Sequence, residues 1–235
     1  MKTSLLKTNR DLLVTLAALL FMPTLIRAAT VIDHVPYKIT GSGDYELDSD
    51  LTAAGTDGIE VDADNVVIDL KGHTLTFTQS QTKHFNGVLV LSAANVTLRN
   101  GTISGFVGGV VLEGPQNKAQ DLQLLNNADF GAGMNGNDGV VINCYIIGTG
   151  TSGSSTGIVL SDNALGVQVR ENQVSECSTA ISSTSLGSGI IHNYVANSTL
   201  GLNLNGTDVY QGNVVTNCHT AFQGGKAIGQ ENGGD

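Results

Sequence analysis

Two ionisable side chains stand at a spacing that could support proton transfer. Glu171 and His192 are separated by about one copy of a repeat that runs through the sequence. If the copies stack, the carboxylate and the imidazole come to lie side by side, and such a pair can act as general acid and base. Arg170 precedes the pair and Tyr194 follows it. A simpler interpretation of this cluster is an exposed polar corner.

A second set of charged residues follows the same repeat. The position after the first inward residue of each copy is occupied by Asp69, Arg99, Asp121, Asn143 and Arg170. This order places Arg99 between two carboxylates, and Lys71 adds a base nearby. The pattern favours an exposed ion-pair ladder, which contributes little stability. The alternative is a charged strip that faces a substrate.

Acidic residues in the turns are weak candidates for a cation site. Carboxylate oxygens are the ligands that Ca²⁺ prefers, and the candidate ligands are Asp62, Asp64, Asp138 and Asp162. However, the sequence lacks the nonapeptide repeat that binds Ca²⁺ in β-solenoids. We therefore expect no cofactor, apart from loosely held Ca²⁺.

The elements that must position these residues form a short repeat of about 20–29 residues. In the copy that starts at Val169, inward-type residues fall at offsets 0, 3, 5, 8 and 11. Further copies start at Leu98, Ile190 and Tyr210, and a weaker copy starts at Gln120. A repeat this short cannot bury its own apolar face, so its copies must stack. Period-2 strands between Gly/Asn/Asp/Ser turns predict an all-β, single-stranded parallel β-helix.

Two columns of this repeat carry specific expectations. Stacking aligns Asn172, Asn193 and Asn213 into a buried ladder of hydrogen-bonded amides. Glycine or alanine opens each coil, as at Gly131 and Gly157. This predicts a tight corner that would reject a bulky side chain or a negative φ.

The N-terminus has the pattern of a secretory signal peptide. A basic start, an apolar core and the small residues Ala28 and Ala29 follow one another in the usual order. Removal of residues 1–28 would change the formal charge from −10 to about −13, with 7 basic and 20 acidic residues left. We expect a secreted or periplasmic protein with no membrane segment after processing. The scarcity of Lys and Arg argues against a nucleic acid partner.

The remaining chain divides into three parts. We assign residues 29–57 to an N-terminal β cap, 58–224 to a β-helix of about seven coils, and 225–235 to a frayed C-terminal tail. No C-terminal cap is evident. Self-association through this uncapped end is therefore a further expectation.

The first coils resemble a known family. The segment from Gly58 to Leu75, with its Asp64-Asn65-Val66 and Asp69-Leu70 motifs, is similar to the opening coil of right-handed β-helix proteins of the pectate-lyase-like superfamily. Asn95-Val96 and Asn100-Gly101 repeat this pattern. Right-handedness is what the resemblance implies, and it agrees with the general rule for parallel crossovers.

The resemblance implies fold more strongly than activity. Pectate lyases of this fold resemble one another in using a Ca²⁺-binding acidic cluster and a basic residue, for which Asp69, Asp121, Arg99 and Lys71 supply the residue types. We expect a non-catalytic exported protein that binds an extracellular glycan or partner along its side. The alternatives are a polysaccharide lyase or epimerase and a structural, self-assembling module.

Overall fold

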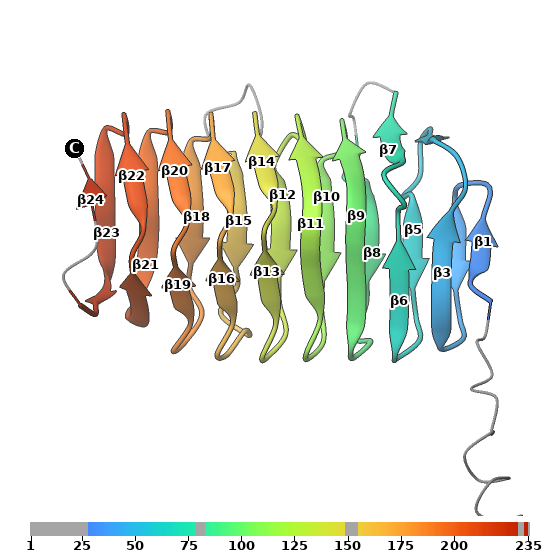
Figure 1. Cartoon of the computed structure of the whole chain (residues 1–235), viewed down its shortest axis with the longest axis horizontal. Helices are drawn as coiled ribbons and strands as arrows, with labels where there is room; N and C mark the ends of the chain where they lie inside the picture. The colour runs from blue at the N-terminus through green and yellow to red at the C-terminus, as the bar shows by residue number, and fades with distance from the viewer. Residues whose placement is uncertain (1–27, 79–82, 149–154, 230–232, 235) are drawn as a thin grey trace, which may run out of the picture.

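The computed structural model describes residues 28–78, 83–148, 155–229 and 233–234. The predicted signal peptide lies almost entirely outside these residues. The described chain is a solenoid of 24 strands without a helix, and every strand pairing is parallel. Figure 1 shows the coils stacked along the long axis from the blue N-terminal side to the red C-terminal side. No helix in the described part of the chain is long and apolar enough to cross a membrane.

Each coil contributes one strand to each of three faces. The first face consists of β2 (Tyr37–Ile39), β5 (Ile59–Val61), β8 (Asn86–Val90), β10 (Gly108–Leu112), β12 (Phe130–Met134), β15 (Thr156–Leu160), β18 (Thr179–Ser183) and the starts of β21 (Leu200–Gln211) and β23 (Thr220–Ala227). The second face consists of β1 (Thr30–Ile32), β3 (Gly43–Leu47), β6 (Val66–Asp69), β13 (Val140–Ile142), β16 (Gln168–Arg170), β19 (Gly189–Ile191), the starts of β9 (Val96–Ser104) and β11 (Lys118–Leu125), and the ends of β21 and β23.

The third face carries the candidate site described below. It consists of β4 (Leu51–Ala53), β7 (Thr74–Phe77), the ends of β9 and β11, β14 (Tyr145–Ile147), β17 (Gln173–Ser175), β20 (Tyr194–Ala196), β22 (Val214–Thr216) and β24 (Gly233–Gly234).

The solenoid has about eight coils, one more than the sequence predicted. The additional coil comes from the segment assigned to the cap. There, β2, β3 and β4 pair in parallel with β5, β6 and β7 of the next coil. In the predicted tail, β23 extends to Ala227 and β24 follows at Gly233–Gly234.

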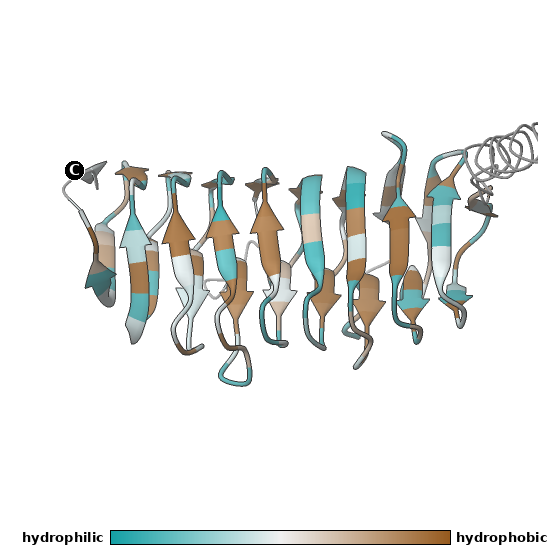
Figure 2. Cartoon of the chain, turned by 60° about the horizontal axis from the view of Figure 1, so that its bottom comes forward, coloured by the Kyte–Doolittle hydropathy of each residue, from teal (hydrophilic) through white to brown (hydrophobic). Residues whose placement is uncertain are grey.

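Alternating side chains fill the interior of every coil. On the third face, Leu75, Ile103, Ile146 and Val195 are in register on their coils and have no solvent exposure. Period-2 alternation produces this arrangement because successive strand residues point to opposite sides. In Figure 2 the apolar residues recur from coil to coil along the whole solenoid. Burial of these columns is the main force that holds the stack together.

The predicted register is wrong in one copy. Ala119, not Gln120, aligns with Leu98 and Val141, so the inward positions of this copy come one residue earlier than predicted. Leu122 and Leu124 are accordingly buried, whereas Gln123 is exposed. A slip of one residue moves every side chain of a strand to the other face. The error was detectable, because the first two predicted inward positions of this copy, Gln120 and Gln123, are polar.

The glycine column is needed for close approach, as predicted, but not for its φ angle. A Cβ on Gly157 would lie 2.5 Å from the carbonyl oxygen of Ala180 and 2.4 Å from Val174. Left-handed residues occur instead at the corners of the coils, for example Asn100, Glu171 and His192 between the second and third faces, with φ of 53–59°. Asparagine tolerates this conformation better than glutamate or histidine does.

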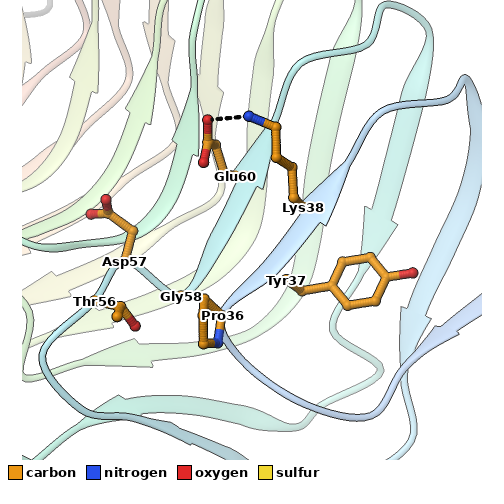
Figure 3. Close-up of a pocket in the computed structure, with 7 residues that line it drawn as sticks. All are labelled: Pro36, Tyr37, Lys38, Thr56, Asp57, Gly58 and Glu60. Atoms are coloured by element: carbon orange, nitrogen blue, oxygen red, sulfur yellow. Dashed lines mark hydrogen bonds and ion pairs between the residues drawn. The ribbon is translucent and has the colours of Figure 1, made fainter.

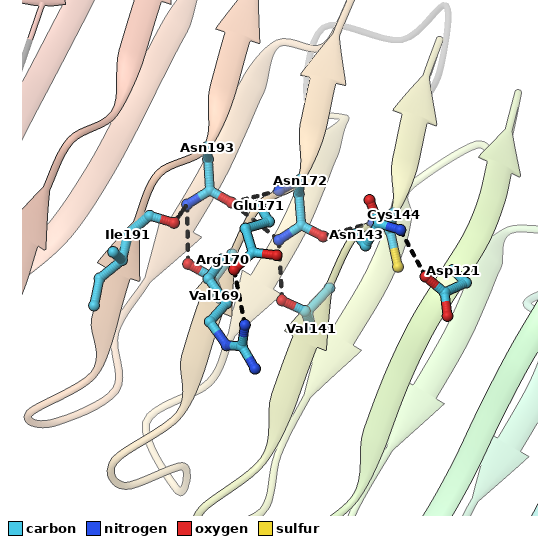
Figure 4. Close-up of polar contacts among 10 residues, drawn as sticks. All are labelled: Asp121, Val141, Asn143, Cys144, Val169, Arg170, Glu171, Asn172, Ile191 and Asn193. Carbon is cyan, nitrogen blue, oxygen red and sulfur yellow. Dashed lines mark hydrogen bonds and ion pairs between the residues drawn. The ribbon is translucent and has the colours of Figure 1, made fainter.

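The asparagine ladder is confirmed. Asn172 Nδ2 and Asn193 Nδ2 each donate to the side-chain oxygen of the next asparagine at 3.0 Å, as Figure 4 shows for the first pair. The same oxygens accept the backbone N–H of Asn172 and Asn193 at 3.0 and 2.9 Å. Asn213 closes the row with an amide donated to Ile190 O at 2.7 Å. The ladder therefore satisfies the buried polar groups of this corner across three coils.

Candidate functional site

The third face carries no charged residue in its described strands. Its sequences are Leu-Thr-Ala in β4, Thr-Leu-Thr-Phe in β7, Tyr-Ile-Ile in β14, Gln-Val-Ser in β17, Tyr-Val-Ala in β20 and Val-Val-Thr in β22. The ends of β9 and β11 add only Thr-Ile-Ser and Gln-Leu-Leu. The other two faces carry ionised side chains such as Lys38, Asp69 and Arg170. The third face therefore differs in chemistry from the rest of the solenoid.

Aromatic and amide side chains alternate along one outward column of this face. Tyr145, Gln173, Tyr194 and Val214 are in register on four successive coils. The two tyrosines are 41% and 47% exposed, so their rings are available to a ligand. Rigid strands hold them in place because the inward neighbours Val174 and Val195 are buried.

The tyrosines border a shallow groove of about 190 Å³. Two coil spacings separate their backbones, which corresponds to about 9.5 Å along the solenoid axis. Gln173 lies between them, and Ser175, Ala196 and Asn197 complete the lining. Within the described part of the chain, neither the tyrosine hydroxyls nor the Gln173 amide makes a hydrogen bond to protein. Among the described residues these polar groups therefore have no protein partner, and a ligand could bind to them.

The groove combines two kinds of contact. A tyrosine ring offers a flat apolar surface with a hydroxyl at its edge. The Gln173 amide can both donate and accept, and the Ser175 hydroxyl can do the same. Flat apolar surface beside neutral hydrogen-bonding groups suits a ligand with both C–H faces and hydroxyl groups.

Two corners border the groove and carry its nearest ionisable groups. Glu171 and His192 occupy the left-handed corner before β17 and β20, and Glu176 occupies the corner after β17. Arg170 Nη1 donates to Glu171 Oε1 at 2.9 Å and forms an ion pair with it, as Figure 4 shows. Glu176 makes no ion pair with another described residue.

The predicted acid/base pair does share a column. The backbone N–H of Glu171 donates to Ile191 O, next to His192, so the two residues lie on adjacent coils. Within the described residues, however, the Glu171 carboxylate is paired with Arg170 and makes no hydrogen bond to His192. The structure thus brings the two residues together without forming an acid/base contact.

The predicted charged strip forms only in its first part. Arg99 Nε donates to Asp69 Oδ2 at 3.0 Å, whereas Lys71 pairs with Glu46 at 3.5 Å. Asp121 and Asn143, which were predicted in the same column as Arg99, both lie one position later, at the left-handed corner, where the Asn143 amide donates to Asp121 Oδ1 at 2.6 Å. Gln120 and Ile142 occupy the predicted column instead. Arg99 therefore lies between Asp69 and Gln120, not between two carboxylates. The misplacement follows from the one-residue register error described above.

Asp69 is held in its ionised form. Burial raises the pKa of its carboxyl group, but the opposing contacts together are stronger. These are hydrogen bonds from the Lys71 N–H and the Asn100 amide, and the charge and hydrogen bond of Arg99. The net effect holds the pKa of Asp69 below its usual value. An ionised, fully hydrogen-bonded carboxylate is a structural ion-pair member rather than a free base.

The predicted cation ligands do not gather into a site. No group of three or more His, Cys, Asp or Glu residues able to hold a metal occurs among the described residues. Asp62 is paired with Lys38 at 2.6 Å, and Asp64 accepts the Ala94 N–H at 2.8 Å. Asp138 and Asp162 lie further along the solenoid, in turns of later coils. The donor set therefore does not fit Ca²⁺, which takes six to eight oxygen ligands.

A second hollow of about 250 Å³ lies near the N-terminal coils (Figure 3). It is lined by Pro36, Lys38, Thr56, Asp57 and Glu60, among others. Lys38 is paired with Glu60 at 2.8 Å, and Asp57 accepts the Asn86 N–H at 2.6 Å. Its charged groups already have partners within the protein, unlike the polar groups of the tyrosine groove.

Sequence reasoning did not single out the groove. The sequence does contain a pattern that could have identified it. Gln173, Tyr194 and Val214 directly follow the three ladder asparagines, and Tyr145 follows the equivalent residue of the preceding coil. An aromatic content of 5% suggested instead that sugar-stacking residues were scarce. Only the strand register shows that two of the five tyrosines lie on one column.

The model of the right-handed β-helix region matches residues 39–200, more than half of the chain. This protein belongs to the right-handed β-helix family. The match also gives the hand of the solenoid, as the sequence predicted. No curated protein matches the sequence.

Two solved structures are similar in fold. The Dettilon tailspike protein has a TM-score of 0.55 and 18% identity, over 81% of this chain and 42% of that one. XylC in complex with xylose has a TM-score of 0.57 and 10% identity, over 77% of this chain and 38% of that one. This chain therefore spans less than half the length of either neighbour, and the likeness concerns the fold alone.

Proposed function

We propose that this protein is an exported, non-catalytic glycan-binding protein and that the glycan lies along the third face. The observation that carries the proposal is the groove in which Tyr145 and Tyr194 flank Gln173. Export rests on the predicted signal peptide. One structural neighbour was solved with xylose bound, which supports a carbohydrate ligand for this kind of scaffold.

The geometry suggests how a glycan would bind. The column of Tyr145, Gln173 and Tyr194 follows the solenoid axis, so a chain of sugars would lie across successive coils. Each ring can stack on a sugar face while the Gln173 amide and the Ser175 hydroxyl bond to sugar hydroxyls. The strands are rigid before binding, which lowers the entropic cost of association.

The pairing of the neighbouring ionisable groups supports binding without cleavage. An enzyme that cuts a glycan needs an acid or base poised beside the sugar. In this structure Glu171 is engaged by Arg170, and Asp69 by Arg99. Among the described residues that line the groove, no acid or base is ionisable apart from the tyrosine hydroxyls.

A polysaccharide lyase or epimerase is the second candidate. The observation in its favour is that Glu171 and His192 lie on adjacent coils at the edge of the groove. Ligand binding would have to separate Glu171 from Arg170 before the carboxylate could act. In that case incubation with a glycan would release unsaturated products or change the configuration of a sugar carbon, and Glu171→Gln would abolish that activity.

The test is glycan binding by calorimetry with the full chain and single variants. We expect Tyr145→Ala, Tyr194→Ala and Gln173→Ala each to weaken binding about tenfold. A tenfold change corresponds to about 1.4 kcal/mol, which is the order of magnitude of one aromatic contact or one hydrogen bond. Tyr194→Phe keeps the ring and should retain most of the affinity.

Gln168→Ala is the matched control, because Gln168 is exposed on the second face of the same coil as Gln173. Equal losses in Gln168→Ala and Gln173→Ala would overturn the assignment to the third face. Absence of binding to any glycan, together with reversible association of the free protein, would favour a structural, self-assembling module instead.

A further inference from the structure

We infer that the glycan is uncharged and that the third face discriminates against polyuronates. This inference rests on the proposed function and adds the chemical class of the ligand. It starts from the absence of Lys, Arg and His in the described strands of the third face, across all its coils. A polyuronate carries a carboxylate on every sugar and would find no cation there to pair with.

One border of the groove is negatively charged. Glu176 directly follows Ser175 of the groove and has no ion-pair partner among the described residues. On the opposite border, the one nearby cation that the described structure places on the same coil is Arg170, and its guanidinium is already paired with Glu171. A uronate bound over Gln173 would therefore meet the Glu176 carboxylate on one side of the strand and, on the other, the Arg170–Glu171 ion pair, which carries no net charge. The carboxylates of the uronate and of Glu176 repel each other, and the repulsion is only partly screened at physiological salt.

The charge of the whole chain acts in the same direction. The sequence has 21 acidic and 11 basic residues, and the predicted mature form is still more acidic. The negative electrostatic potential of such a chain lowers the local concentration of an anionic polymer before any contact is made. The neutral hydrogen-bonding groups of the groove, by contrast, match the hydroxyl groups of a neutral glycan.

The experiment compares matched neutral and acidic polymers at about 0.15 M salt, where only charges within roughly 8 Å act fully. The probes are polygalacturonate, the same polymer after carboxyl reduction, alginate, xylan and glucomannan. We expect at least one neutral polymer to bind at least tenfold more tightly than either acidic polymer. We also expect Tyr194→Ala to remove most of that binding.

A charge variant tests the physical cause. Glu176→Lys should raise the affinity for polygalacturonate several-fold and leave the affinity for the neutral polymer within a factor of two. Asp162→Lys is the matched control, because it makes the same charge change in an exposed turn of the same coil, between the first and second faces. It should alter neither affinity by more than a factor of two.

The outcomes separate the two proposals. Acidic polymers that bind as tightly as neutral ones, with binding lost in Tyr194→Ala, would overturn the inference and keep the proposed function. Binding that Tyr194→Ala leaves unchanged, or no binding to any polymer, would overturn the proposed function and the inference with it. Equal effects of Glu176→Lys and Asp162→Lys on polygalacturonate would show that net charge, not the groove border, sets the preference.

Discussion

At the scale of single residues, side chains on this solenoid have different roles depending on which side of a strand or corner they occupy. Asp69 is an example, because its neighbours on the next coil supply Arg99 and Asn100 as partners. Its carboxylate is mostly buried, with 16% of the side chain exposed. Its ionised form is therefore favoured by the fold itself.

The lowered pKa of Asp69 predicts a pH-dependent stability. A carboxyl group whose pKa is lower in the folded state contributes stability above its unfolded pKa of about 3.9, and this contribution is lost as pH falls through the folded pKa. We expect Asp69→Asn to reduce the free energy of unfolding by about 1–3 kcal/mol at pH 7. The difference between wild type and variant should shrink below about pH 4. Denaturant melts between pH 2 and pH 7 measure this, and a difference that does not change with pH would contradict the assignment.

Glu176 is a residue whose backbone conformation does not match its type. Its φ is 59°, whereas the equivalent positions on the next two coils are asparagines with φ of 53° and 51°. We expect Glu176→Asn to raise the free energy of unfolding by about 0.5–1 kcal/mol, because asparagine accepts the left-handed region at lower cost. The new amide would also extend the contact in which Asn217 Nδ2 donates to Asn197 Oδ1 at 2.6 Å. Thermal melts of this variant and of Glu176→Gln, which keeps the longer side chain, separate the backbone effect from loss of the charge.

At the scale of elements, the coil corners hold the strands in register. The asparagine ladder occupies the corner between the second and third faces, directly before the strands that carry Gln173 and Tyr194. Each ladder oxygen accepts from the backbone of the preceding coil. The ladder therefore fixes the position of each coil along the solenoid axis relative to the next coil. It thereby also fixes the distance between Tyr145 and Tyr194 across the groove.

Removal of the middle ladder residue tests this coupling. Asn193→Ala leaves the Asn172 N–H without its acceptor and leaves the Asn172 amide with Val141 O alone. We therefore expect the free energy of unfolding to fall by about 1–3 kcal/mol. The triple change of Asn172, Asn193 and Asn213 to alanine should cost less than three times as much, because donors and acceptors disappear together. Urea melts measure both values. Strict additivity would contradict a stacked ladder.

At the scale of the whole molecule, the solenoid is a one-dimensional array in which each coil contacts only its neighbours. The free energy of unfolding is then approximately the sum of one contribution from each coil and one from each interface between neighbouring coils. Local stability can therefore vary along the array. The central coils carry fully buried columns, whereas the residues of β23 are exposed or half-buried throughout. We expect opening to begin at β23 and to proceed toward the centre.

Hydrogen exchange measures this gradient. Amides of β23 should exchange fastest, those of β20 and β21 more slowly, and those of β9 to β15 slowest, because protection follows the local opening free energy. Equal protection across the described strands would show that the solenoid opens as one unit. If protection of β23 rises with protein concentration, the exposed strand is covered by another copy, as the sequence analysis anticipated for this end.

The sequence by itself determined the fold class, the interior columns of most copies and the asparagine ladder. These features depend on local periodicity, since alternation within a strand and a fixed spacing between Val169, Asn172 and Val174 decide which side chains point inward. The predicted register of the copy at Gln120 was wrong for the same reason. Its periodicity is ambiguous, and a shift of one residue exchanges the inward and outward sides of the strand.

Only the tertiary structure decided which outward residues come together. Coil lengths vary along the chain, so the neighbour of a given outward residue depends on the length of every intervening turn. That dependence placed Asp121 at a corner instead of beside Arg99, and it aligned Tyr145 with Tyr194 across Gln173. The uncharged third face likewise emerges from strands that are about a coil apart in sequence and become adjacent only through parallel pairing.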